Sequence, residues 1–236
     1  MATRRVVLIP VYNEVRHLDG LLARLREVYD GDVMCIDDGS SDGSAGVLKR
    51  VEDQRTRVVL QEENRGYGAT LLHGFREVIQ AGFEYVITMD SDGQHRPDWI
   101  NGFFKEIPGW DIVSGRRYCA ESDSEGVAPH DRRAINSRVT QVINGITGFG
   151  ITDAFCGFKA YRVSALAKLD ITETGYAMPL QVWLQARHFG LRVTERPVSR
   201  IYDDPNRSFG GDLDNPDIRL KLYLDTIEKE RQRWKL

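Results

Sequence analysis

The chain has 236 residues, of which 41% are hydrophobic and 28% charged, the proportions of a soluble globular protein. Its 32 basic and 35 acidic side chains leave a net charge of −3, which gives no support to a general nucleic-acid or membrane-binding surface. No stretch approaches the roughly 20 apolar residues of a transmembrane segment. The three cysteines fit neither a zinc site nor a disulfide framework, so we expect one cytoplasmic domain over residues 1–236.

Short apolar segments alternate with helical patterns along the chain. We expect strands at residues 5–11, 33–37, 58–61, 85–90 and 111–114, with helices between them at 14–29, 41–54, 69–81 and 97–106. After a polar loop at 118–131 we expect a helix at 132–145, a strand at 158–161, a helix at 179–189 and a strand at 192–201. An amphipathic helix at about 217–235 ends the chain. This alternation predicts an α/β fold with a mostly parallel central sheet flanked by helices.

Polar residues follow three of the expected strands. Residues 10–14 ("PVYNE") end the first strand, residues 37–40 ("DDGS") end the second, and Asp90 and Asp92 end the fourth. In an open parallel sheet ligands bind at the carboxyl edge, near the switch in strand order. We therefore expect these segments to share one crevice.

Asp90 and Asp92 are suited to a divalent cation. Carboxylates separated by one residue can converge on one ion, and hard oxygen ligands favour Mg²⁺ or Mn²⁺. Gln94 could add an amide oxygen or hold a metal-bound water. The alternatives are a solvated turn, or a cap for the helix expected from Pro97.

Two further loops accompany this pair. Asp37 and Asp38 directly end an apolar strand, where a carboxylate could accept hydrogen bonds from a nucleoside. The alternative, an Asx turn plus a helix N-cap, explains Ser41 or Asp42 well but does not explain why two carboxylates directly end an apolar strand. Residues 64–69 ("NRGYGA") contain glycines that permit a close approach of the backbone.

Together these segments resemble the family 2 glycosyltransferases of the GT-A fold. The resemblance is carried by "IPVYNE", "DDGSSDGS", "NRGYGA" and "DSDGQH", and continues through "SGRRY", "RRAINS" and "DAFCGFKAYR". Their order and spacing are most similar to the dolichol-phosphate mannose synthase branch, over residues 4–210.

The resemblance implies an inverting transfer of a sugar from a nucleoside-diphosphate sugar of the GDP-mannose or UDP-glucose class. The residues that would hold the nucleoside are Pro10, Tyr12, Glu14, Ile36 and Asp38. The metal would be coordinated by Asp90, Asp92 and Gln94, with the backbone of Ser91 nearby. Arg117, Arg133 and Arg207 would face the donor diphosphate or an acceptor phosphate. The expected catalytic residues, beside the reacting groups, are Asp92, Arg117 and Arg133.

The same branch acts on polyprenyl phosphates, which implies a location at the inner face of a membrane. An acceptor that is already a phosphate anion needs no strong general base, and none is obvious in this sequence. Asp153 lacks the preceding Glu found in many family 2 enzymes that elongate saccharides. We expect Arg117 and Arg133 to hold the acceptor phosphate. The alternative is that both serve the donor and that the acceptor is a sugar hydroxyl.

Other functions fit the sequence less well. An NAD(P)-dependent oxidoreductase, like a sugar nucleotidyltransferase, should have a glycine-rich loop after its first strand, where this chain has "PVYNE". A sugar-nucleotide-binding pseudoenzyme is disfavoured by the intact Asp90, Asp92 and Gln94. The terminal helix could lie in a bilayer interface, although packing on the core is the commoner use of an apolar helix face.

Overall fold

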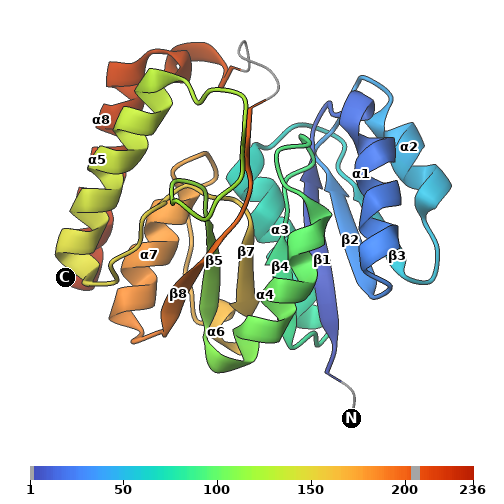
Figure 1. The fold of residues 1–236 in the computed structure, drawn as a ribbon, viewed down its shortest axis with the longest axis horizontal. Coiled ribbons are helices and arrows are strands. Elements are labelled where there is room, and N and C mark those ends of the chain that lie inside the picture. Colours follow the sequence, from blue (N-terminus) through green and yellow to red (C-terminus); the bar gives the residue numbers. More distant parts are fainter. Residues whose placement is uncertain (1–2, 203–207) are drawn as a thin grey trace.

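Helices cover both faces of a seven-stranded sheet in the computed structural model, which describes residues 3–202 and 208–236 (Figure 1). The strands follow the order β3–β2–β1–β4–β7–β5–β8. Their bounds are β1 Arg5–Val11, β2 Asp32–Asp37, β3 Thr56–Leu60, β4 Tyr85–Thr88, β5 Ile112–Arg116, β7 Lys159–Arg162 and β8 Val193–Pro197. Among the strands that the structure describes, only β7 runs antiparallel to its neighbours, so the prediction of a mostly parallel α/β sheet is confirmed.

Eight α-helices connect or flank these strands in the described part of the chain. They are α1 Val15–Val28, α2 Ser44–Val51, α3 Tyr67–Gln80, α4 Ile100–Glu106, α5 His130–Thr147, α6 Val163–Leu166, α7 Met178–His188 and α8 Pro216–Trp234. Short 3₁₀ turns lie at Pro97–Trp99, Ile107–Gly109 and Gly211–Asp214.

The side-chain alternation of the strands divides the core into two layers. In β1, Val7 and Ile9 pack into the layer covered by α1, α2 and α4, whereas Val6 and Leu8 pack into the layer covered by α3, α5, α7 and α8. Gly74 allows α3 to lie close to β1, because a Cβ there would be 2.5 Å from Leu8 Cδ1. Because successive side chains of a strand point to opposite faces, one strand contributes to both layers of the core.

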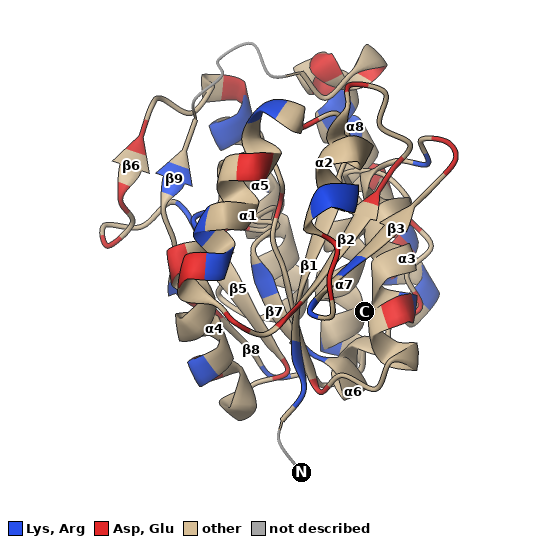
Figure 2. Cartoon of the chain, turned by 90° about the vertical axis from the view of Figure 1, so that its right-hand side faces the viewer, with Lys and Arg blue, Asp and Glu red and all other residues tan. Residues whose placement is uncertain are grey.

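Two predicted elements differ from the structure, and one observed helix, α6, was not predicted. Helix α2 begins at Ser44 instead of residue 41, because Gly43 has a φ of 105° and the Asp42 side chain accepts the Ser44 amide. The strand expected at 192–201 divides where β5, its partner, ends, and its second part, β9 (Arg200–Ile201), pairs with β6 (Ser124–Glu125) in the segment predicted as a loop (Figure 2). The four-residue helix α6 is too short to show a helical period.

The connections between strands place the switch in strand order between β1 and β4. The chain moves outward from β1 to β2 and β3, and then returns to β4 on the other side of β1. The loops that follow β1 and β4 therefore diverge over the two faces and leave a crevice between them. The segments singled out in the sequence lie at this edge.

Helix α8 packs on the core, against α5 and α7. Its buried Glu230 accepts hydrogen bonds from Gln181 Nε2 at 2.7 Å, Gln185 Nε2 at 3.0 Å and Trp234 Nε1 at 2.8 Å. Tyr223, also on α8, packs into the hydrophobic core. Across residues 3–202 and 208–236, no helix combines the length and apolar character that crossing a bilayer requires.

Replacing Glu230 by Ala should lower the free energy of unfolding by about 3 kcal/mol or more, because the substitution leaves buried amide donors without their charged acceptor. Glu228→Ala on the same helix is the matched control. Glu228 is exposed and pairs with Arg231, so its loss should change stability by less than about 1 kcal/mol. Urea unfolding of both variants measures the difference, and equal changes would contradict the docking role of Glu230.

Candidate active site

A cleft of about 1220 Å³ opens at the carboxyl edge of the sheet, at the switch between β1 and β4. Most of the residues predicted from the sequence line it: Pro10, Tyr12, Glu14, Asp38, Asp90, Ser91, Asp92, Gln94 and Arg117. They come from loops that follow β1, β2, β4 and β5. The structure therefore brings together side chains that lie more than 100 residues apart in sequence.

The loop "DDGSSDGS" is bound to the start of α1 by side-chain oxygens. The amides of Glu14 and Val15 donate to Ser44 Oγ at 3.0 Å and to Asp42 Oδ2 at 2.9 Å. Asn13, which has a φ of 55°, donates its amide to Ser40 Oγ at 2.9 Å. These amides belong to the first turn of a helix and its approach, where no intrahelical acceptor exists. The serines and Asp42 of the motif therefore connect two loops of the cleft.

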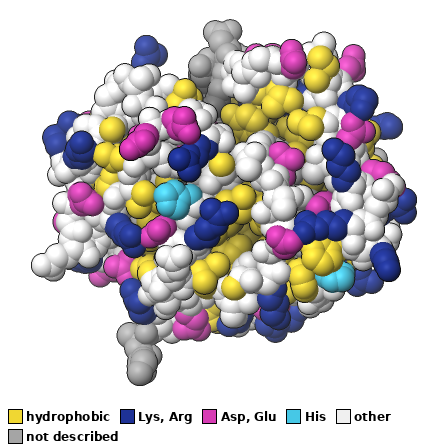
Figure 3. Space-filling model, turned by 180° about the vertical axis from the view of Figure 1, so that it is seen from behind, with side chains coloured by type: hydrophobic (Ala, Val, Ile, Leu, Met, Phe, Trp, Pro, Cys, Tyr) yellow, Lys and Arg dark blue, Asp and Glu magenta, His cyan; other side chains and the backbone are white. Residues whose placement is uncertain are grey.

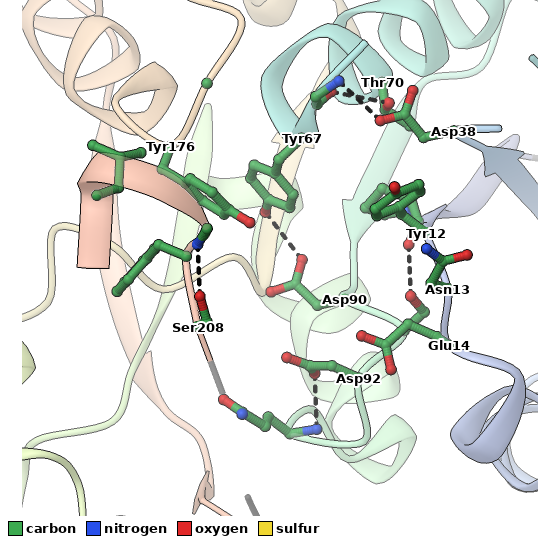
Figure 4. A pocket seen from close by; sticks show the side chains of 18 of the residues that line it. Tyr12, Asn13, Glu14, Asp38, Tyr67, Thr70, Asp90, Asp92, Tyr176 and Ser208 are labelled. Atoms are coloured by element: carbon green, nitrogen blue, oxygen red, sulfur yellow. Dashed lines mark hydrogen bonds between the residues drawn. The ribbon is translucent and has the colours of Figure 1, made fainter. Parts of the chain in front are cut away.

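Asp38 connects a third loop. Its carboxylate is buried and accepts hydrogen bonds from the amides of Arg65 and Gly66, both at 2.9 Å. Gln61 Nε2 donates to the same carboxylate at 3.2 Å. Asp38 also lines the cleft, beside the exposed ring of Tyr12 (Figure 4). It thus holds the segment "NRGYGA" at the wall of the cleft.

Asp90 and Asp92 lie on the turn after β4. The Ser91 hydroxyl between them donates to the Pro10 carbonyl at 2.8 Å, which connects this turn to the end of β1. The backbone N–H of Gln94 donates to Asp92 Oδ1 at 2.9 Å. Among the described residues no three His, Cys, Asp or Glu side chains form a closed metal cage. Asp90, Asp92 and Gln94 nevertheless line the same cleft, and hard oxygen donors that do not enclose an ion fit a cation that also takes ligands from a substrate.

His95 supports this turn from behind. Its Nδ1 accepts the Asp90 backbone amide at 3.0 Å, so the ring is neutral with its other nitrogen protonated. The ring stacks on Phe158 with 5.0 Å between centroids. Burial lowers the pKa of His95, which favours the same neutral form. His95 therefore supports the turn and does not line the main cleft.

Arg117 lies in the cleft wall and is bound to Asp153. Its Nε and Nη2 donate to the two carboxylate oxygens at 2.7 Å and 3.0 Å, and Asn136 Nδ2 donates at 2.8 Å. Burial alone would raise the pKa of Asp153, but the Arg117 charge and these hydrogen bonds lower it to about 2. A fully buried carboxylate with this pKa is unsuited to act as a general base near pH 7.

Three predicted site residues are not placed in the cleft. The side chain of Ile36 is buried in the core, because its position in β2 points it into the layer under α3. Arg133 is exposed and absent from the cleft wall, whereas the preceding residue, Arg132, lines it. Successive helical residues point about 100° apart, so only one of the two arginines faces the cleft. Arg207 lies outside the described residues.

An aromatic wall of the cleft begins at Tyr67, beside Asp90, and extends away from the loops of β1 and β2. Tyr67 stacks on Tyr176 with 5.8 Å between centroids, and Tyr176 meets the edge of Phe209 at 5.2 Å. The guanidinium of Arg132 lies over Phe209 at 4.6 Å. Hydrophobic side chains also gather around a hollow in the upper part of the view from behind (Figure 3). Tyr67 belongs to "NRGYGA", but no sequence pattern distinguishes Tyr176 or Phe209.

The chain matches the family described as glycosyl transferase family 2 over residues 6–170. It belongs to this family. The predicted resemblance is therefore confirmed, and the chain is a glycosyltransferase with the GT-A arrangement of sheet and helices.

Two curated members of the family are similar along most of the chain. The undecaprenyl-phosphate mannosyltransferase of Micrococcus luteus is 28% identical over 84% of this chain and 84% of its own length. The polyprenol monophosphomannose synthase of Mycolicibacterium smegmatis is also 28% identical, over 83% of this chain and 77% of its own length. These similarities agree with the branch indicated by the motifs.

Two solved glycosyltransferase structures share the fold. Glucosyl-3-phosphoglycerate synthase from Mycobacterium tuberculosis, in complex with Mn²⁺, uridine diphosphate and glucosyl-3-phosphoglycerate, superposes with a TM-score of 0.70 at 16% identity. The superposition covers 97% of this chain and 80% of that chain. Mannosyl-3-phosphoglycerate synthase from Rubrobacter xylanophilus superposes with a TM-score of 0.72 at 17% identity, covering 99% and 75% of the two chains.

Asp153→Asn should remove a pH-dependent part of the stability of this glycosyltransferase. The folded-state pKa of about 2 lies below the ordinary value of 3.8, so ionised Asp153 stabilises the fold fully above pH 3.8. That contribution, about 2 kcal/mol, is lost as the pH falls through 2. The difference in unfolding free energy between the wild type and Asp153→Asn should narrow by about 1 kcal/mol from pH 6 to pH 3.

Urea unfolding at several pH values measures this difference. Asp225→Asn is the control, because Asp225 is exposed on α8 and pairs only with Lys221 there among the described residues. A gap between the wild type and Asp153→Asn that stays constant with pH would contradict the assigned role of the Arg117–Asp153 pair.

Proposed function

We propose that the chain transfers a sugar, with inversion, from a metal-bound nucleoside-diphosphate sugar to a polyprenyl phosphate. The observation that supports this most directly is the cleft itself. One part presents the carboxylates of Asp90 and Asp92 between the β1 and β4 loops, and the aromatic wall presents Arg132 among its rings. The two curated relatives, which are named for undecaprenyl phosphate and for polyprenol monophosphomannose, support the same acceptor.

The donor occupies the end of the cleft formed by β1, β2 and β4. Tyr12 offers an exposed aromatic face for a base, and the Asp38 loop with Glu14 borders the nucleoside. Asp90, Asp92 and Gln94 hold Mg²⁺ or Mn²⁺, with the Ser91 backbone beside them. When bound, the ion neutralises negative charge on the departing diphosphate. The Mn²⁺ in the Mycobacterium tuberculosis neighbour supports a divalent ion of this kind.

The acceptor lies along the aromatic wall. Arg132 lines the cleft and is suited to a phosphate, because a guanidinium can donate two hydrogen bonds to it. The rings of Tyr176 and Phe209 provide apolar surface for the adjoining isoprene units. Arg117 stays with Asp153 and shapes the wall between donor and acceptor. In this proposal Arg132 holds the acceptor phosphate, which is the role expected from the sequence for Arg133.

A neutral saccharide hydroxyl is the rival acceptor. Such a hydroxyl must lose a proton on attack, which calls for a general base. Asp153 is the carboxylate at the corresponding motif, and its binding to Arg117 and Asn136 disfavours that role. A phosphate acceptor is already an anion at neutral pH and needs no such group.

A polyprenyl acceptor places the cleft mouth at a membrane surface on the cytoplasmic side. Two exposed apolar side chains lie close in sequence to residues that line the cleft: Ile218, which precedes Arg219 in α8, is 46% exposed, and Val127, in the segment before Arg132, is 87% exposed. Since α8 itself packs on the core, membrane contact in this proposal involves these loop and helix ends and not a whole helix face.

Asp92→Asn should abolish most metal-dependent donor binding while leaving the fold intact. For the wild type, GDP or UDP with Mn²⁺ at a hundredfold excess over Kd should stabilise the fold by about 2.7 kcal/mol, or roughly 5–10 °C in Tm. The variant should lose this shift and keep its circular dichroism spectrum. Asp98→Asn, outside the main cleft, is the control and should behave like the wild type. If the Tm of Asp92→Asn still depends on Mn²⁺ as in the wild type, the metal assignment is wrong. If NADH alone raises the Tm of the wild type, an oxidoreductase is favoured.

Arg132→Ala should raise the KM for a short-chain polyprenyl phosphate about tenfold or more, because one charge-assisted hydrogen bond is worth about 1.5–3 kcal/mol. The KM for the donor should change little. Arg133→Ala removes the same side chain from the exposed neighbouring position and should stay near wild type. Equal effects of the two variants, or efficient transfer to a neutral sugar and none to a lipid phosphate, would refute the acceptor assignment.

A further inference from the structure

Tyr67 forms a hydrogen bond with one of the two acidic residues of the proposed metal site. Its hydroxyl lies 3.0 Å from Asp90 Oδ1 (Figure 4). An ionised carboxylate only accepts hydrogen bonds, so the hydroxyl must be the donor. Figure 4 shows Tyr67 reaching from α3 into the cleft toward this carboxylate. The contact connects the start of α3 with the turn after β4. The segment before α3 has no other role in the proposed metal site.

The ring of Tyr67 is held before any ligand binds. It is the first residue of α3, directly after the Arg65 and Gly66 amides that Asp38 accepts. Tyr176 stacks on the ring at an interplanar angle of 13°. The Ala69 amide donates to the Thr174 carbonyl at 3.0 Å, which holds the loop of Tyr176 against the start of α3. The hydroxyl therefore has a defined position relative to the sheet.

Asp90 is confined on its other sides as well. A Cβ at Gly157 would lie 2.4 Å from Asp90 Oδ2 and 2.9 Å from the Tyr67 hydroxyl, so only glycine leaves room for both groups. His95 holds the Asp90 backbone through its amide. His95 thus holds the backbone of Asp90, and Tyr67 holds one oxygen of its carboxylate. Gly157 limits the space beside the other oxygen. Among the described residues, Tyr67 makes the hydrogen bond that selects the rotation of the carboxylate.

We propose that Tyr67 is a positioning residue for the metal site: its hydroxyl orients the Asp90 carboxylate toward the ion. This inference rests on the proposed role of Asp90 and Asp92 as metal ligands. Groups that orient a ligand in this way commonly change metal affinity by about 10–100-fold when they are removed. Tyr67 contributes through Asp90 and does not contact the reacting atoms.

Tyr67→Phe tests the proposal, because it removes only the hydroxyl and keeps the ring that stacks on Tyr176. Its matched control is Tyr29→Phe, since Tyr29 is a buried tyrosine that donates to the Arg5 carbonyl, also at 3.0 Å, away from the cleft. The Kd for Mn²⁺ is measured by electron paramagnetic resonance of the free ion, with saturating GDP or UDP. We expect it to rise about tenfold in Tyr67→Phe and to stay at the wild-type value in Tyr29→Phe.

A kinetic measurement separates positioning from general damage. In Tyr67→Phe the Mn²⁺ concentration for half-maximal transfer should rise with the Kd, while kcat at saturating Mn²⁺ stays close to wild type, because the lost interaction acts on binding. The Tm in EDTA should remain close to that of Tyr29→Phe. Wild-type Mn²⁺ affinity in Tyr67→Phe, or the same loss in both variants, overturns the proposal.

A second variant keeps the inference testable if Tyr67→Phe does not fold. Gly157→Ala retains the hydroxyl but displaces the Asp90 carboxylate from the other side, and should also weaken Mn²⁺ binding about tenfold or more. Wild-type affinity in Gly157→Ala would show that the carboxylate orientation does not matter. If the wild-type chain itself binds no Mn²⁺, the proposed metal site fails and not the positioning role alone.

Discussion

The cleft depends on one physical constraint: backbone amides at the carboxyl edge of the sheet need acceptors that the sheet and helices do not supply. Short polar side chains from neighbouring loops meet this need. Asp42 and Ser44 accept the first amides of α1, and Asp38 accepts those of the segment before α3. Because each acceptor belongs to a different loop from its donor, the hydrogen bonds hold the loops to one another. The motif residues thus shape the nucleotide-binding edge even before a ligand contacts them.

The constraint explains which conclusions the sequence could support. The strands of the sheet, most of the helices and the lining residues near β1, β2 and β4 follow from local patterns, because hydrophobic periodicity and polar strand ends are local properties. Arg132, and not Arg133, lines the cleft because the rotational phase of α5 is set by its packing against α7 and α8, which no local pattern reports. The resemblance implies a role for Ile36 as a position beside the nucleoside, whereas side-chain alternation in β2 sends its side chain into the core.

The aromatic wall of the cleft could not be predicted for a different reason. Tyr67, Tyr176 and Phe209 are separated by more than 30 residues at each step and meet only through the packing of α3 with the loop before α7 and the segment before α8. No periodic pattern reports such contacts. The antiparallel insertion of β7 is equally nonlocal, since nothing in its four residues, "KAYR", indicates the direction in which the strand runs. Sequence patterns identify the donor side better because its residues follow strands directly.

The Arg117–Asp153 pair connects this architecture to the chemistry. A carboxylate that is buried, bidentately bound and further bonded by Asn136 supports the wall of the cleft. The same interactions that make it a stable structural element lower its pKa to about 2 and so remove its ability to take a proton at neutral pH. An enzyme that commits this carboxylate to structure works best with an acceptor that carries its own negative charge. The polyprenyl phosphate of the proposed function satisfies that condition, and Arg132, which lines the cleft, carries the opposite charge.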